Sequence, residues 1–139
     1  MVDRRIVLTH DDYAVLKQLV DTLKRTNKTK IPQFARFVRE MDVAIVMESE
    51  TIPDDGVTMH SRVGFTYVDS KETDHAVLVF PAQTNDAPEN VSILSPLGLA
   101  LIGERRGAEL EYVAPGGSYT LRVDTVEHRH AVRTDTLRS

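Results

Sequence analysis

The spacing of apolar residues changes near residue 56 of this 139-residue chain, and this change constrains the fold more than any other feature. Before it, apolar residues recur every three or four positions, which is typical of one face of an α-helix. After it, β-branched and aromatic residues alternate with polar ones, which is typical of strands. Helices followed by strands predict an α+β fold.

Two helices are expected before the change. The first, over residues 11–25, follows Thr9, whose hydroxyl suits an N-cap with Asp12 three positions on. The second, over residues 32–48, begins at Pro32, in a first turn that tolerates proline. Their apolar stripes are Tyr13, Leu16, Leu19, Val20 and Leu23, and Phe34, Phe37, Val38, Met41 and Ile45. Because only the polar segment RTNKTK joins them, the helices should form an antiparallel hairpin, a short coiled coil.

Strands and one short helix are expected after the turn sequence Pro53-Asp54-Asp55-Gly56. The segment from Pro96 to Gly103 has the proline and glycine that open and close a short buried helix. The five expected strands cover residues 57–68, 75–80, 91–94, 108–113 and 119–128. We therefore expect an antiparallel or mixed sheet curled around one helix. The expected units are a helical hairpin over 1–52, a strand-rich domain over 53–130 and a flexible tail over 131–139.

The net charge is small, but basic and acidic residues are unevenly distributed along the chain. The chain has 17 Lys and Arg against 21 Asp and Glu, which gives −4. Residues 1–50 carry nine basic and eight acidic residues, or +1, whereas residues 51–139 carry eight and thirteen, or −5. The expected hairpin tip holds Lys24, Arg25, Lys28 and Lys30. A basic tip suits either a solvated turn or attraction to phosphate or to an acidic protein surface.

Composition excludes several classes of protein. The chain has no cysteine, so disulfides, thiolate metal sites and cysteine nucleophiles are excluded. The apolar run Ile6–Leu8 is too short for a signal peptide, and no stretch is long enough to span a membrane. We expect a cytoplasmic protein without membrane contact. Since the basic tip has no aromatic residue for base stacking, any contact with DNA or RNA should be weak and indirect.

The histidines do not form a recognisable metal motif. His60 and His75 lie on separate expected strands, and His128 and His130 lie at the end of the last strand and beyond it. The pair His128 and His130 beside Glu127 leaves open a metal at the chain end, although any i, i+2 pair shares one face of a strand.

Two acidic pairs and one glycine-rich turn have structural explanations. Asp11-Asp12 suits a helix start and Asp54-Asp55 suits a turn. Pro115-Gly116-Gly117 suits a tight connection between strands better than a phosphate cradle. We therefore expect no catalytic residue, no metal and no cofactor.

Residues 94–117, LSPLGLALIGERRGAELEYVAPGG, resemble the C-terminal domain of the bacterial Gre transcript-cleavage factors. The shared pattern is Ser-Pro, an apolar helix ending Leu-Ile-Gly, an alternating strand and Pro-Gly-Gly. Residues 57–63, VTMHSRV, resemble the first strand of that domain, in the form found in Rnk-type regulators of nucleoside diphosphate kinase. With the hairpin included, the resemblance covers residues 5–128. It implies an FKBP-like C-terminal domain and a coiled coil that enters the secondary channel of RNA polymerase.

The resemblance also implies roles for particular residues. Ser95 and Pro96 match positions that contact the rim of the polymerase channel, whereas Leu94 stands where the family has an acid. Cleavage factors carry two acids at the hairpin tip that help hold magnesium, but this chain has the basic tip described above. Arms of about 15 and 17 residues reach only about 23 to 26 Å, less than in a full cleavage factor. A non-enzymatic regulator of elongation is expected.

Three alternatives remain open at the sequence level. The first is a true cleavage factor, and the second is a regulator of nucleoside diphosphate kinase levels. The third is a peptide-binding or prolyl isomerase module on an FKBP-like fold. For the last, the candidate pocket residues are Phe65, Tyr67, Phe80, Tyr112 and Tyr119, several of which must belong to the core. An exposed apolar stripe on so short a hairpin also permits a homodimer.

Overall fold

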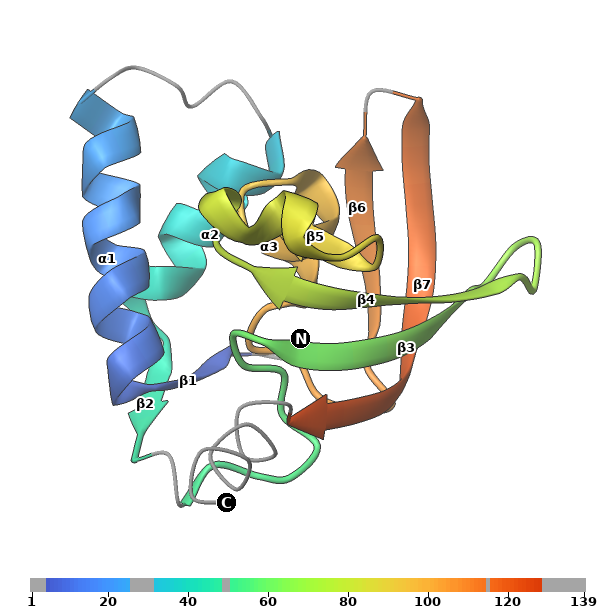
Figure 1. Cartoon of the computed structure of the whole chain (residues 1–139), viewed down its shortest axis with the longest axis horizontal. Helices are drawn as coiled ribbons and strands as arrows, with labels where there is room; N and C mark the ends of the chain where they lie inside the picture. Colours follow the sequence, from blue (N-terminus) through green and yellow to red (C-terminus); the bar gives the residue numbers. More distant parts are fainter. Residues whose placement is uncertain (1–4, 26–31, 49–50, 115, 129–139) are drawn as a thin grey trace.

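The computed structural model describes residues 5–25, 32–48, 51–114 and 116–128. They form an α+β structure in which α1 stands at one side of a twisted sheet (Figure 1). The α+β class expected from the sequence is confirmed. The elements in chain order are β1 (Val7–Thr9), α1 (His10–Arg25), α2 (Pro32–Asp42), β2 (Ile45–Met47), β3 (Ser61–Tyr67), β4 (Thr73–Val79), the 3-10 helix η2 (Pro81–Asp86), β5 (Asn90–Ser92), α3 (Pro96–Leu101), β6 (Glu109–Ala114) and β7 (Gly117–His128).

Five strands form the main sheet in the order β5-β4-β3-β7-β6. β4 and β5 are parallel and the other neighbours are antiparallel, so the sheet is mixed. All five expected strands are present, although β3 begins at Ser61 rather than Val57. The N–H of Val57 donates to the carbonyl of Glu104 at 2.8 Å, and its carbonyl accepts the N–H of Gly103 at 3.0 Å. These bonds tie Val57 to the segment after α3 instead of to the β3 ladder.

The first and third helices begin and end close to the predicted positions. The N–H of Asp12 donates to Thr9 Oγ1 at 3.0 Å, which is the predicted N-cap of α1. α3 begins at Pro96, and Gly103 follows it with a φ of +79°, a conformation that favours glycine after a helix. Among the described residues, every helix is too short or too polar to cross a lipid bilayer.

The second helix is shorter than predicted. α2 ends at Asp42, and Ile45–Met47 form β2, so the placement of Ile45 on a helical stripe is wrong. β2 pairs in parallel with β1, with Val7 opposite Ile45. The sequence analysis did not predict this small sheet. Apolar residues near the end of α2 suit a helix as well as a strand, and the partner strand that decides between them lies far away in the sequence.

Apolar side chains from both parts of the chain join one core. Leu16 and Val20 of α1, Phe34 and Phe37 of α2 and Phe65 of β3 all belong to it. α2 packs against α3 and β6, whereas α1 packs against β1 and β2. The coiled coil, the FKBP-like description and the boundary between residues 52 and 53 stay predictions.

Candidate functional site

The two residues expected to contact a partner, Ser95 and Pro96, form the start of α3. Ser95 Oγ accepts the N–H of Gly98 at 3.0 Å and donates to the carbonyl of Ser92 at 2.8 Å. Pro96 is the first helical residue, where its missing N–H has no consequence. Both side chains are half-buried. They therefore fix the start of the helix and still present part of their surface to solvent.

The predicted basic tip lies partly within the described residues. Lys24 and Arg25 end α1, and both are exposed. Lys28 and Lys30 lie outside the described residues. Cations at the carboxyl end of a helix interact favourably with its dipole, which gives Lys24 and Arg25 a local stabilising role as well.

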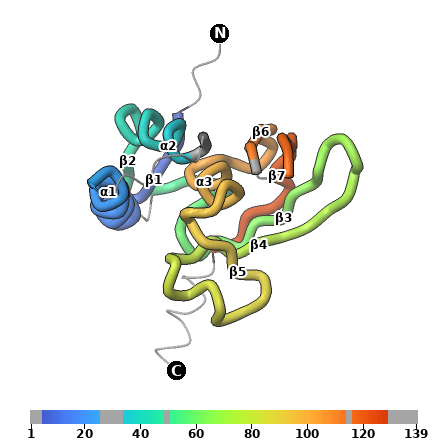
Figure 2. The backbone as a smooth tube through the Cα atoms, turned by 90° about the horizontal axis from the view of Figure 1, so that it is seen from above, coloured from blue at the N-terminus to red at the C-terminus, as the bar shows by residue number. Residues whose placement is uncertain are grey.

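The structure does not bring the two candidate sites together. The end of α1 and the start of α3 belong to elements that stand apart in both views (Figures 1 and 2). A partner that contacts both must therefore cover a broad surface rather than fill one pocket.

In each of the two acidic pairs, Asp11-Asp12 and Asp54-Asp55, one carboxylate accepts hydrogen bonds from another segment of the chain. Asp12 Oδ2 accepts the N–H of Met59 at 2.9 Å, which joins α1 to the segment before β3. Both carboxylate oxygens of Asp55 accept from Arg105, at 3.3 and 3.4 Å. These acids hold segments of the fold in place.

Two histidines bond to separate partners. His60 Nε2 lies 3.0 Å from Gln83 Oε1. His128 Nε2 donates to the carbonyl of Gly56 at 2.6 Å. His130, part of the metal site left open above, lies outside the described residues. Within the described part of the chain, no three His, Asp or Glu side chains gather where a metal ion would fit.

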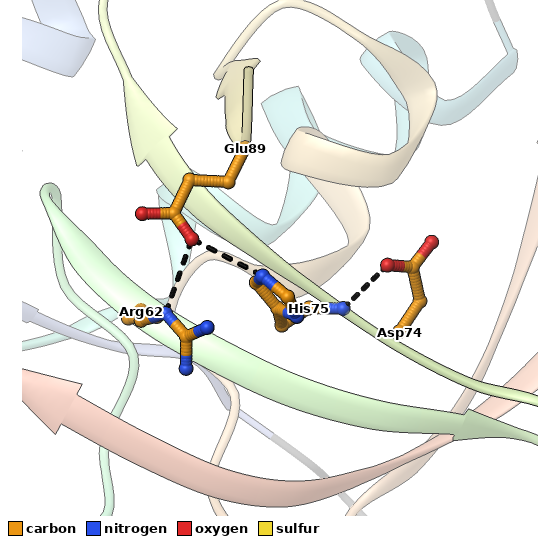
Figure 3. Close-up of polar contacts among 4 residues, drawn as sticks. All are labelled: Arg62, Asp74, His75 and Glu89. Carbon is orange, nitrogen blue, oxygen red and sulfur yellow. Dashed lines mark hydrogen bonds and ion pairs between the residues drawn. The ribbon is translucent and has the colours of Figure 1, made fainter. Parts of the chain in front are cut away.

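A third histidine belongs to a polar cluster on the face of the sheet (Figure 3). Glu89 Oε1 lies 3.1 Å from Arg62 Nε and 3.2 Å from His75 Nε2. The backbone N–H of His75 donates to Asp74 Oδ1 at 2.8 Å. Because Arg62 is on β3, His75 is on β4 and Glu89 precedes β5, these contacts join three neighbouring segments of the sheet.

Three tyrosines line a cleft of about 660 Å³ that the sequence analysis did not separate from the core. Tyr112 and Tyr119 face each other across β6 and β7 and stack with ring centroids 5.5 Å apart. The Tyr67 and Tyr119 rings meet edge to face at 5.9 Å. Burial, followed by a hydrogen bond with Tyr67, raises the pKa of the Tyr112 hydroxyl well above its ordinary value. Tyr112 is therefore a neutral phenol at physiological pH.

Comparison with known proteins identifies the family. The model of the family described as transcription elongation factor, GreA/GreB, C-term, matches residues 52–128, more than half of the chain. The chain belongs to the GreA/GreB family. The matched part includes the whole main sheet and α3, and therefore Ser95 and Pro96 as well as the tyrosine cleft.

Two relatives of the chain differ in how much of their length the chain covers. A regulator of nucleoside diphosphate kinase from Escherichia coli K12 is 36% identical over 99 residues, which are 70% of this chain and 73% of that protein. A transcription elongation factor GreA from Nitrobacter hamburgensis is 37% identical over 76 residues, 53% of this chain but only 48% of that protein. The chain thus covers about half of the GreA relative.

A solved structure supports the fold over nearly the whole chain. The prokaryotic transcription elongation factor GreA/GreB from Nitrosomonas europaea is 32% identical and superposes with a TM-score of 0.73. The match covers 90% of this chain and 99% of that one. The likeness therefore extends beyond the matched C-terminal part into the helical segment.

Proposed function

We propose that this chain regulates transcript elongation by binding RNA polymerase at its secondary channel, without stimulating transcript cleavage through acids at a hairpin tip. Membership of the GreA/GreB family supports polymerase as the partner. The observation that carries the proposal is the exposed basic end of α1, formed by Lys24 and Arg25. The protein would act by occupying the channel and competing with other factors there.

The charge of the tip argues against metal delivery. Magnesium in such sites is bound by carboxylate oxygens. The sequence between Thr22 and Arg39 contains no Asp or Glu, but it does contain Lys24, Arg25, Lys28 and Lys30. Like charges repel a cation, so this tip disfavours the ion that acidic tips hold. The 16 residues of α1 span only about 24 Å, which also suits a short finger.

The proposal assigns a role to each part of the chain. Residues 1–52 would act as a coiled-coil finger, residues 53–130 as an FKBP-like docking domain and residues 131–139 as a flexible tail. Ser95 and Pro96 would contact the channel rim, and Lys24, Arg25, Lys28 and Lys30 would lie at the tip of the finger. The proposed mechanism uses no cofactor. The proposal also allows a homodimer, which sedimentation of the purified protein would detect.

Binding to purified RNA polymerase tests the role of the tip. We expect the full chain to bind, and the double variant Lys24→Glu/Arg25→Glu to bind at least tenfold more weakly. Lys17→Glu is the matched control, because Lys17 lies on the same helix and makes only an exposed contact with Asp21 at 3.5 Å. Failure of the unmodified chain to bind at moderate salt would refute the proposal.

The role of Ser95 requires a control for stability. Ser95→Ala removes an N-cap, and so does Thr9→Ala at the start of α1, where the corresponding bond is also 3.0 Å. Both should lose about 0.5 to 2 kcal/mol of stability. Only Ser95→Ala and Pro96→Ala should weaken polymerase binding, measured well below the unfolding temperature. Equal binding by all three variants would remove Ser95 and Pro96 from the docking surface.

A backtracked elongation complex separates this proposal from the cleavage alternative. We expect the protein to change the elongation rate, or the response to an added cleavage factor, without producing shortened transcripts. Shortened transcripts at catalytic amounts of the protein would establish a cleavage factor instead. The second alternative is a regulator of nucleoside diphosphate kinase levels. If the amount of that kinase changes only when its transcription changes, this regulation is a consequence of transcription control.

A further inference from the structure

The tyrosine cleft lies between the β3–β4 connection and the paired strands β6 and β7. It is lined by Tyr67 at the end of β3, by the β3–β4 connection, and by Tyr112 and Tyr119 beside the β6–β7 connection. The β3–β4 connection and β7 lie on the side of the molecule away from α1 (Figure 1). Tyr119 is 40% exposed, whereas Tyr112 is only 7% exposed. The cleft therefore has a buried aromatic floor and one ring open to solvent.

The framework of the cleft is fixed by hydrogen bonds. The N–H of Tyr67 donates to the carbonyl of Glu72 at 2.8 Å, and the N–H of Val68 donates to that of Thr120 at 2.9 Å. The hydroxyls of Tyr67 and Tyr112 lie 3.4 Å apart. These contacts hold the aromatic rings and the acidic connection in one arrangement before any ligand arrives.

The rim of the cleft is acidic. Asp69 and Glu72 line it, and both are exposed. Among the described residues, neither carboxylate takes part in an ion pair. Asp74 lies close enough to raise the pKa of Tyr112 through its charge. The described residues that line the cleft include Asp69 and Glu72 and no basic residue, so the rim favours a cation over an anion.

Aromatic faces beside carboxylates suit one kind of ligand. A cation over an aromatic face is attracted by its quadrupole, and a planar guanidinium both stacks on a ring and pairs with carboxylates. A purely apolar ligand would cover Asp69 and Glu72 without compensating their charge. We propose that this cleft binds an arginine side chain of a partner polypeptide, with the guanidinium on Tyr119 and paired with Asp69 and Glu72. This surface is separate from Ser95 and from the basic tip, so it does not depend on the function proposed above.

The chain offers its own optical probe of this cleft. It has no tryptophan and four tyrosines, three of which line the cleft. The fourth, Tyr13, is on α1 and is removed by Tyr13→Phe. Tyrosine emission of this variant then reports on the cleft. The titrants are the peptide acetyl-Gly-Arg-Gly-amide and its citrulline counterpart, which has nearly the same shape but no charge.

The expected result is a saturable change in emission with the arginine peptide. Its dissociation constant should be in the millimolar range, and the citrulline peptide should bind roughly fivefold to tenfold more weakly. Asp69→Asn and Glu72→Gln should each weaken binding of the arginine peptide by roughly threefold. Asp86→Asn is the matched control, because Asp86 is an exposed acid of η2 outside the cleft lining.

Three outcomes would overturn the proposal. Equal binding of the arginine and citrulline peptides would mean that charge is not recognised. Binding unchanged in the double variant Asp69→Asn/Glu72→Gln would place the peptide elsewhere. Self-association that Glu72→Gln abolishes, measured by sedimentation, would assign the cleft to a second copy of this chain instead of to another polypeptide.

Discussion

At the residue scale, Gly98 in α3 is the glycine with the least room for a side chain. An added Cβ would lie 2.2 Å from the carbonyl oxygen of Ser92 and 3.0 Å from Ile93 Cα. Both atoms belong to the backbone at the end of β5, so they cannot turn aside as a flexible side chain does. We expect Gly98→Ala to lower the free energy of unfolding by about 1 to 3 kcal/mol, measured by urea denaturation.

Gly56→Ala is the control for this prediction. Its added Cβ would meet the Pro53 carbonyl oxygen at 3.4 Å, an ordinary contact distance. The free energy of unfolding should change by roughly 0.5 kcal/mol or less. Equal losses in both variants would mean that α3 and β5 are not as closely packed as these distances imply.

A second residue-scale prediction concerns Asp124 and acid. A hydrogen bond from Thr66 Oγ1, at 2.5 Å from Asp124 Oδ2, is the largest cause that lowers the pKa of this carboxyl, and Arg122 adds to it. A carboxyl with a lowered pKa stabilises the fold above its unfolded value of about 3.9. That contribution is lost as the pH falls through the lower folded value.

Thr66→Val should therefore raise the pKa of Asp124 toward the unfolded value. The folded and unfolded pKa values of Asp124 then differ less. The free energy of unfolding should therefore fall less as the pH is lowered below about 4. Carboxyl titration by NMR measures the first effect, and denaturation at several pH values measures the second. Thr73→Val, an exposed threonine at the start of β4, should change neither. An unchanged Asp124 titration in Thr66→Val would assign the shift to Arg122 alone.

The tyrosine cleft shows what residue-level reasoning missed. The sequence analysis grouped Tyr67, Tyr112 and Tyr119 with Phe65 as candidate pocket or core residues. The structure places Phe65 in the core at 1% exposure, and Tyr112 belongs both to the core and to the lining of the cleft, with Tyr67 and Tyr119. The pairing of β6 with β7 could have been used to predict part of the cleft, because a tight turn between these strands places Tyr112 opposite Tyr119. Tyr67 comes from a strand far away in the sequence, and no local pattern indicates its position.

At the scale of elements, the cluster around Glu89 tests how β3, β4 and the segment before β5 are held together (Figure 3). The side chains of Arg62 and Glu89 are 37% and 29% exposed, so water screens their interaction. We expect a coupling energy of about 0.2 to 1 kcal/mol between them. A double-mutant cycle with Arg62→Ala, Glu89→Ala and the double variant, followed by urea denaturation, measures it.

The control cycle joins Arg122 and Asp124, a partly exposed pair two positions apart on one strand. Its coupling should be no larger than that of Arg62 and Glu89, because it joins no separate segments. Zero coupling between Arg62 and Glu89 would show that this ion pair contributes nothing to holding this edge of the sheet together.

Elements with local signals were predicted well, and those that depend on distant pairing were not. The N-cap at Thr9, the proline at the start of α3 and the turn between β6 and β7 are local, and each lies close to its predicted place. β2 was predicted as helix because its pairing with β1 is not local. The same limit applies to the candidate sites, since a local motif pointed to Ser95 as a candidate, whereas the cleft is built from three strands and has no local motif.

At the scale of the whole molecule, the single core bears on whether residues 1–52 form a unit of their own. Phe37 of α2 is 2% exposed, and its helix packs against α3 and β6. Removing its ring should cost about 3 to 5 kcal/mol, a large part of the roughly 5 to 15 kcal/mol typical of a domain. We expect Phe37→Ala to destabilise the helices and the main sheet together.

Two probes measured on the same samples decide between one unit and two. Far-ultraviolet circular dichroism follows the helices, and tyrosine fluorescence follows the main sheet, which carries three of the four tyrosines. In one cooperative unit, both transitions move to lower urea by the same amount in Phe37→Ala. Arg39→Ala, at an exposed position of the same helix, should leave both nearly unchanged. If only the helical transition moved, the helical segment would unfold independently of the main sheet, and the chain would consist of two folding units instead of one.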